Sequence, residues 1–178
     1  MRRTSRVIRF ATVLLLAVLA APPGARGQQA GSPRCAAPEY RQFDFWLGEW
    51  EVRNPSGAVV GTNSITADLG GSVLREHWRG GGGSTGRSFN IYDRSTGSWH
   101  QTWVDNSGLL LRLDGGLVDG AMVLRGETVG RDGSPSLQRI TWTPGDDGNV
   151  RQLWESSSDA GATWSTVFDG TYVKQSRD

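Results

Sequence analysis

The sequence predicts an all-β fold: a closed up-and-down antiparallel barrel of about ten strands, preceded by one short helix. After Gly48, short segments rich in β-branched and aromatic residues are separated by turn signals, and many of the 25 glycines lie at those turns. No stretch after Leu47 is long enough for a crossover helix, which excludes a parallel βαβ sheet. We expect the strands to close into a barrel, because closure removes exposed sheet edges.

Residues 1–27 are predicted to be a signal peptide. Arginines within the first nine residues precede a nearly unbroken apolar run from Phe10 to Ala21. This run is too short to span about 30 Å of hydrocarbon as a helix, but it suits the apolar region of a signal peptide. We therefore expect a bacterial protein that is secreted or periplasmic and has no membrane association after cleavage. A retained membrane anchor is the alternative.

Residues 28–38 are predicted to be a flexible neck that contains the single cysteine, Cys35. One cysteine excludes an intramolecular disulfide framework and a cysteine-based metal cluster. We expect a free thiol, which leaves pairing between chains, and hence a homodimer, open.

The domain over 39–178 is predicted to begin with an amphipathic helix over 39–47, because Tyr40, Phe43 and Trp46 lie at helical spacing. Asp114-Gly115-Gly116 is among the turn signals that we take to separate the strands. The strands are expected near 49–53, 58–67, 72–79, 86–92, 98–104, 109–113, 120–127, 136–143, 149–156 and 163–173.

Three motifs occur in sequence order along this domain. They are F-D-F-W-L-G-E-W at 43–50, G-S-V-L-R-E-H-W at 71–78 and W-H-Q-T-W-V-D-N-S-G at 99–108. Together with a later element at 157–164, they resemble a bacterial lipocalin-like domain family of the calycin type. The resemblance implies a barrel whose Gly48 and Trp50 close one end, as the lipocalin G-x-W does. It brings no established catalytic residues.

Alternation within four predicted strands provides the main functional prediction. Alternate residues of a strand share one face, and here four such faces combine aromatic side chains with amides, hydroxyls or carboxylates. The opposite faces carry Arg75, Arg87 and other cationic residues that would be costly in a dry core. We therefore expect the mixed faces to line a cavity. The candidate ligand-binding residues are Glu76, Trp78, Asn90, Gln101, Trp103, Gln152 and Trp154.

The leading hypothesis is an exported barrel that binds a small, partly polar molecule and catalyses no reaction. The first alternative is an enzyme in the same cavity with Glu76 or Asp105 as general acid or base, since burial among tryptophans raises a carboxyl pKa. The second is a structural envelope protein with a filled barrel. If the faces are inverted, the arginines would line the cavity and an anionic ligand would be favoured.

Two further motifs are interpreted as hairpins. Gly81 to Ser88 is close to the spacing of a phosphate-binding loop, but a strand follows where a helix N-terminus is needed. Ser157 to Trp164 fits the Asp-box pattern of sialidase-like propellers. One copy cannot make a propeller, so Asp159, Gly161 and Trp164 are assigned a structural role.

The remaining ligand classes are disfavoured by composition. Without the five arginines of residues 1–27, 14 Lys and Arg stand against 18 Asp and Glu, a net charge of −4, which does not favour nucleic acid. His77 and His100 lie on the face opposite their acidic neighbours, so we expect no metal and no other cofactor. In the alternative, both histidines face the same side of neighbouring strands, and this arrangement would allow haem or a metal to bind.

Cleavage is expected before Gln28, because the small residues Ala25 and Gly27 stand where a signal peptidase reads them. N-terminal sequencing of the exported protein should start at or near Gln28. A full-length product retained in the membrane would contradict this prediction.

Overall fold

The computed structural model describes residues 35–130 and 132–175. The predicted signal peptide and most of the neck lie outside these residues. Within the described ranges, no helix is long and apolar enough to cross a membrane.

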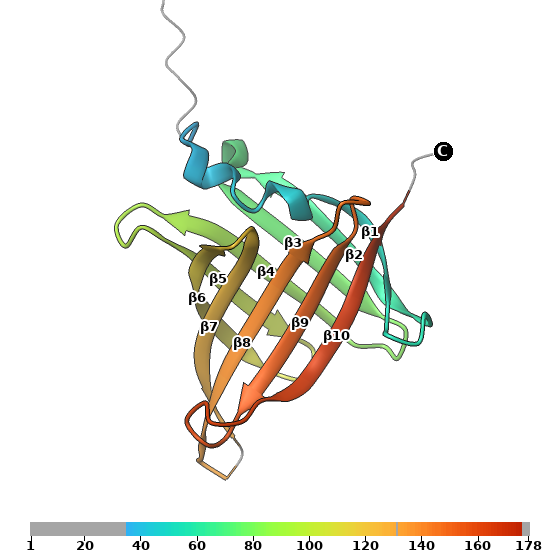
Figure 1. The fold of residues 1–178 in the computed structure, drawn as a ribbon, viewed down its shortest axis with the longest axis vertical. Coiled ribbons are helices and arrows are strands. Elements are labelled where there is room, and N and C mark those ends of the chain that lie inside the picture. Colours follow the sequence, from blue (N-terminus) through green and yellow to red (C-terminus); the bar gives the residue numbers. More distant parts are fainter. Residues whose placement is uncertain (1–34, 131, 176–178) are drawn as a thin grey trace, which may run out of the picture. The chain divides into compact units, whose positions relative to one another are not determined.

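Ten antiparallel strands form the closed barrel that the turn spacing predicts (Figure 1). Each strand pairs with its neighbours in the sequence, and β1 pairs with β10 to close the sheet, with Trp50 opposite Lys174. The strands are β1 Gly48–Arg53, β2 Val59–Asp68, β3 Val73–Gly80, β4 Thr85–Asp93, β5 Ser98–Asp105, β6 Leu110–Val118, β7 Ala121–Val129, β8 Pro135–Pro144, β9 Val150–Ser157 and β10 Ser165–Lys174.

The predicted N-terminal helix consists of two short 3-10 turns, η1 Pro38–Arg41 and η2 Asp44–Trp46. A third turn, η3 Leu69–Gly71, joins β2 to β3. Phe43 separates the first two turns with φ −107° and ψ 7°, outside the α-helical range. The segment is therefore helical at the predicted place, but it is not one continuous α-helix.

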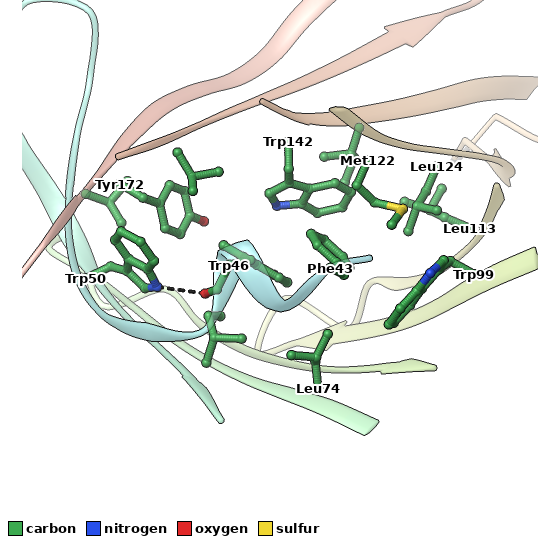
Figure 2. Close-up of a cluster of buried hydrophobic side chains, with 14 of the residues drawn as sticks. Phe43, Trp46, Trp50, Leu74, Trp99, Leu113, Met122, Leu124, Trp142 and Tyr172 are labelled. Atoms are coloured by element: carbon green, nitrogen blue, oxygen red, sulfur yellow. Dashed lines mark hydrogen bonds between the residues drawn. The ribbon is translucent and has the colours of Figure 1, made fainter. Parts of the chain in front are cut away.

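Phe43 and Trp46 fill one end of the barrel. In Figure 2 the two rings lie at the centre of a set of apolar side chains from the strands, with Trp99 and Trp142 among them. Phe43 stacks on Trp46 with ring centroids 5.0 Å apart and meets Trp142 edge-on at 5.1 Å. The indole Nε1 of Trp50 donates a hydrogen bond of 2.9 Å to the carbonyl oxygen of Trp46, which ties the entering segment to β1.

The predicted turn at Asp114-Gly115-Gly116 is wrong, because β6 continues through it to Val118. A Cβ at Gly115 would lie 2.1 Å from the carbonyl oxygen of Val123 on β7. This glycine therefore permits a close approach of two strands, a role that glycine has inside strands as well as in turns. The turn lies at Asp119-Gly120, where both residues have positive φ, as a tight two-residue hairpin requires.

The Asp-box segment is a hairpin between β9 and β10, as predicted. The Ser157 hydroxyl donates to Asp159 Oδ1 at 2.7 Å and accepts from the Gly161 N–H at 2.8 Å. Asp159 Oδ1 also accepts from the Thr163 N–H at 2.9 Å, and the Trp164 indole donates to the Gly161 carbonyl at 3.2 Å. Hydrogen bonds, first of all from the Thr163 side chain, lower the pKa of Asp159 to about 2.

The glycine-rich segment from Gly81 forms the β3–β4 hairpin and not a phosphate site. The Gly80 N–H donates to the Ser84 carbonyl at 2.8 Å, and β4 begins directly afterwards at Thr85. No helix N-terminus follows, which is the feature that phosphate binding would need.

Truncation of Trp50 to Ala is expected to lower the free energy of unfolding by about 3–5 kcal/mol, because the ring is 1% exposed and packs on Tyr172. Chemical denaturation followed by circular dichroism measures the change. Phe89→Ala, on the outer face with 57% of the residue exposed, is the control and should change stability by roughly 0.5 kcal/mol or less. A near-zero effect at Trp50 would contradict the burial of its ring.

Candidate functional site

The mixed aromatic and polar faces point into the barrel, as the alternation predicts. Glu76 on β3, Gln101 on β5 and Gln152 on β9 are buried, whereas Arg75 and Arg87 are exposed on the outer face. The inverted arrangement, with arginines in the lumen, is therefore excluded for these strands.

A cavity of about 460 Å³ occupies the part of the barrel that Phe43 and Trp46 leave open. Six of the seven predicted ligand-binding residues line it. The seventh, Asn90, is buried but is not part of the lining. The lining comprises Asn54, Val60, Glu76, Trp78, Ser84, Gln101, Trp103, Leu111, Ile140, Gln152, Trp154, Val167, Phe168, Asp169 and Tyr172.

Glycines on the barrel wall leave space for the rings of two tryptophans of the cavity. A Cβ at Gly86 would lie 2.2 Å from the ring of Trp103, and one at Gly61 would lie 2.6 Å from the ring of Trp78. The rings can lie this close to the wall only because glycine has no side chain. Any side chain at these positions would push a ring away from the wall.

Glu76 is the central polar group of the cavity. Its Oε1 accepts a hydrogen bond of 2.7 Å from Asn63 Nδ2, and its Oε2 accepts one of 2.6 Å from the Ser88 hydroxyl. Burial raises the pKa of Glu76 to about 7, and the bonds from Ser88 and Asn63 limit that increase. The carboxyl group therefore changes its charge near neutral pH.

A chain of hydrogen bonds links Glu76 to both sides of the lumen. Towards β5, Asn90 Nδ2 donates to the Ser88 hydroxyl at 2.9 Å, and Gln101 Nε2 donates to Asn90 Oδ1 at 2.8 Å. Towards β9, Asn63 Nδ2 also donates to the Tyr172 hydroxyl at 3.2 Å, and that hydroxyl donates to Gln152 Oε1. The side chains in this chain form a polar band across the lumen: Glu76, Asn63, Ser88, Asn90, Gln101, Tyr172 and Gln152. Each is held by at least one hydrogen bond within the protein, so the band is ordered by its own contacts.

Sequence reasoning missed Asn63 and Tyr172, and it placed Ser88 on a mixed face without naming it as a site residue. Asn63 and Ser88 donate directly to Glu76, whereas the predicted site residues Asn90 and Gln101 are linked to it through Ser88. Asn63 lies on β2 at the same parity as the buried Ile65, which was the available signal. Only the strand register shows that Ser88 stands opposite Glu76.

Asp105 does not share the cavity with Glu76. Partial burial acts to raise the pKa of Asp105. The hydrogen bonds from Ser107, Trp103 and Leu109 together have the larger, opposite effect, so this pKa lies below its ordinary value. Its Oδ2 accepts from Trp103 Nε1 at 3.3 Å. Asp105 therefore stabilises a turn and the position of Trp103, and any proton transfer in the cavity would rest on Glu76.

The two histidines do not lie on neighbouring strands, because β4 separates β3 from β5. Arg87 Nη2 donates a hydrogen bond of 3.2 Å to His77 Nε2, and His100 Nδ1 lies 2.8 Å from Asp114 Oδ1. In the part of the chain that the structure describes, no group of three or more His, Cys, Asp or Glu side chains is placed to hold a metal ion.

No protein-family model matches the chain, and no curated protein matches it in sequence. The closed ten-stranded barrel with its aromatic interior is consistent with a lipocalin-like fold.

Glu76 is expected to make the stability of the protein depend on pH. Its folded pKa of about 7 exceeds the ordinary value of 4.5, so the folded state holds a proton that the unfolded state loses first. Stability that is present at pH 4 is therefore lost as the pH rises to 8, by about 3 kcal/mol for this group. Urea denaturation of the wild type and Glu76→Gln at both pH values isolates the effect. Equal pH dependence of the two proteins would contradict it.

Proposed function

We propose that this protein is an exported, lipocalin-like barrel that binds a small, partly polar molecule in its lumen and catalyses no reaction. The observation that carries the proposal is the cavity of about 460 Å³, which has aromatic walls and a few directed polar groups. Small-molecule sites in proteins have this size and this composition. The bound molecule would lie among the rings of Trp78, Trp103 and Trp154. Glu76, Gln101 and Gln152 would orient it by hydrogen bonds. Asn90 would contribute indirectly, by holding the amide of Gln101.

The polar band supports the proposed binding because hydrogen bonds within the protein already orient its groups. Ser88 and Asn63 fix the Glu76 carboxyl, and Asn90 holds the amide of Gln101. Preorganised polar groups reduce the entropy that binding has to overcome. The same cavity weighs against the alternative of a structural protein with a filled barrel.

Proton transfer by Glu76 is the second candidate function. A pKa raised by burial to about 7 suits a general acid or base at neutral pH. It ranks second because the other carboxylate of the lining, Asp169, is held by Arg151 at 2.9 and 2.8 Å. Among the described residues of the lining, Glu76 therefore has no second unpaired carboxylate to act with it.

Export and association are proposed on sequence grounds. Cleavage before Gln28 would release the chain into the periplasm or the medium. Cys35 has a free thiol and is partly exposed, which is compatible with a homodimer linked through the neck.

Mass spectrometry of the small molecules released from the exported, purified protein tests the proposed binding. We expect one compound to be bound by the wild type and to quench its tryptophan fluorescence saturably. Gly86→Ala should bind it about tenfold more weakly, equivalent to roughly 1.4 kcal/mol, because the new methyl group moves Trp103 away from the wall.

Gly82→Ala is the matched control, because a Cβ at Gly82 meets nothing within 4 Å. It should bind as the wild type does. Conversion of the compound by the wild type would favour the enzyme, whereas no bound compound and no quenching by any extract would overturn the proposed function.

A further inference from the structure

The lining of the cavity is acidic. Its charged residues are Glu76 and Asp169, and none of the described lining residues is Lys, Arg or His. Asp169 forms an ion pair with Arg151. Glu76 instead accepts its two hydrogen bonds from neutral groups, so its charge is not compensated within the protein.

We propose that the ligand is an organic cation, a protonated amine on an apolar or aromatic body, whose ammonium group binds Glu76. This inference rests on the proposed binding function and specifies the class of ligand. An ionised carboxylate buried without a cation is costly, so a ligand that carries the cation and hydrogen-bond donors would compensate the charge of Glu76.

The carboxylate of Glu76 has room for a ligand donor. Each of its oxygens accepts one hydrogen bond within the protein, whereas an ionised carboxylate offers about four lone-pair sites. Asn63 Oδ1 is also buried and has no hydrogen-bond partner among the described residues, but Asn63 does not line the cavity. Glu76 lines the cavity, so its unused acceptor sites are the complement of an ammonium group with its N–H donors.

The aromatic walls suit the same class of ligand. Trp78, Trp103, Trp154 and Phe168 line the cavity, and Trp78 and Phe168 pack edge-on with centroids 5.9 Å apart. A cation within about 6 Å of an aromatic ring is attracted by the negative face of the ring. Leu111 and Ile140 line the cavity as well and would contact the apolar body of the ligand.

Binding of such a ligand should strengthen as the pH rises through 7. Burial raises the pKa of Glu76 to about 7, so the carboxyl group is largely protonated at pH 5 and ionised at pH 8. Burial also raises the pKa of Tyr172 well above its ordinary value, so this phenol stays neutral. The other acidic residue of the lining, Asp169, pairs with Arg151, whose hydrogen bonds lower the pKa of Asp169, so that carboxylate stays ionised. The remaining polar groups around Glu76 are uncharged: Asn63, Ser88, Gln101 and Gln152. Its sequence neighbours Arg75 and His77 lie on the opposite face of β3.

Isothermal titration calorimetry of the mature protein with three probes of matched size tests the inference. The probes are 2-phenylethylamine, 2-phenylethanol and phenylacetate, which carry a cation, a neutral donor and an anion on the same ring. At pH 8 we expect the amine to bind at least about tenfold more tightly than the alcohol, and phenylacetate to bind least. Glu76→Gln should abolish the preference for the amine.

Glu127→Gln is the control for the loss of one negative charge, since Glu127 is exposed on β7 and is not part of the lining. It should retain the preference. A readout on the wild type covers the case in which Glu76→Gln does not fold: binding of the amine should strengthen between pH 5 and pH 8, while binding of the alcohol should not.

The outcomes separate this inference from the proposed function. If the alcohol or phenylacetate binds as tightly as the amine, or if the compound that co-purifies is neutral or anionic, the ligand is not a cation but the barrel is still a binding protein. If no probe binds and no compound co-purifies, both proposals fail.

Discussion

Pairing of β1 with β10 is the interaction on which the rest of the structure depends. It closes the sheet, and closure turns the alternation of side chains along each strand into an inside and an outside. Every inward side chain must then pack, form a hydrogen bond or face the cavity. Trp50 takes the first course and Asn90 the second, while Trp154 lines the cavity and donates from its indole to Gln138 at 2.7 Å.

The two ends of the lumen are used differently because one chain segment enters only one of them. At that end the stacked rings of Phe43 and Trp46 are fully buried and belong to the apolar core. Nothing comparable enters the other end among the described residues, and there Trp78 and Trp103 lie against glycines on the wall. A single barrel thereby contains a dry core and an open cavity, with the polar band between them.

Glu76 illustrates a conflict between stability and binding. A buried carboxyl group without a cation costs folding free energy at neutral pH, and an apolar residue of similar volume would cost less. The proposed binding function would explain a carboxyl group at this place, whereas folding stability alone would not. Binding sites commonly hold groups that the fold alone would not select.

The sequence by itself determined the barrel, the position of most of its turns and the inward faces, because turn chemistry and strand alternation are local properties of the chain. It located Glu76, Gln101 and the cavity tryptophans for the same reason. It misread Asp114 to Gly116, since a glycine needed for a close approach of strands looks the same as one needed for a turn. Only the tertiary structure decided that Asn63 and Ser88 donate to Glu76, and that Asn90 and Asp105 are not part of the cavity lining. These facts depend on which residues of different strands stand opposite each other, and that register is fixed by closure of the whole sheet and not by any segment alone.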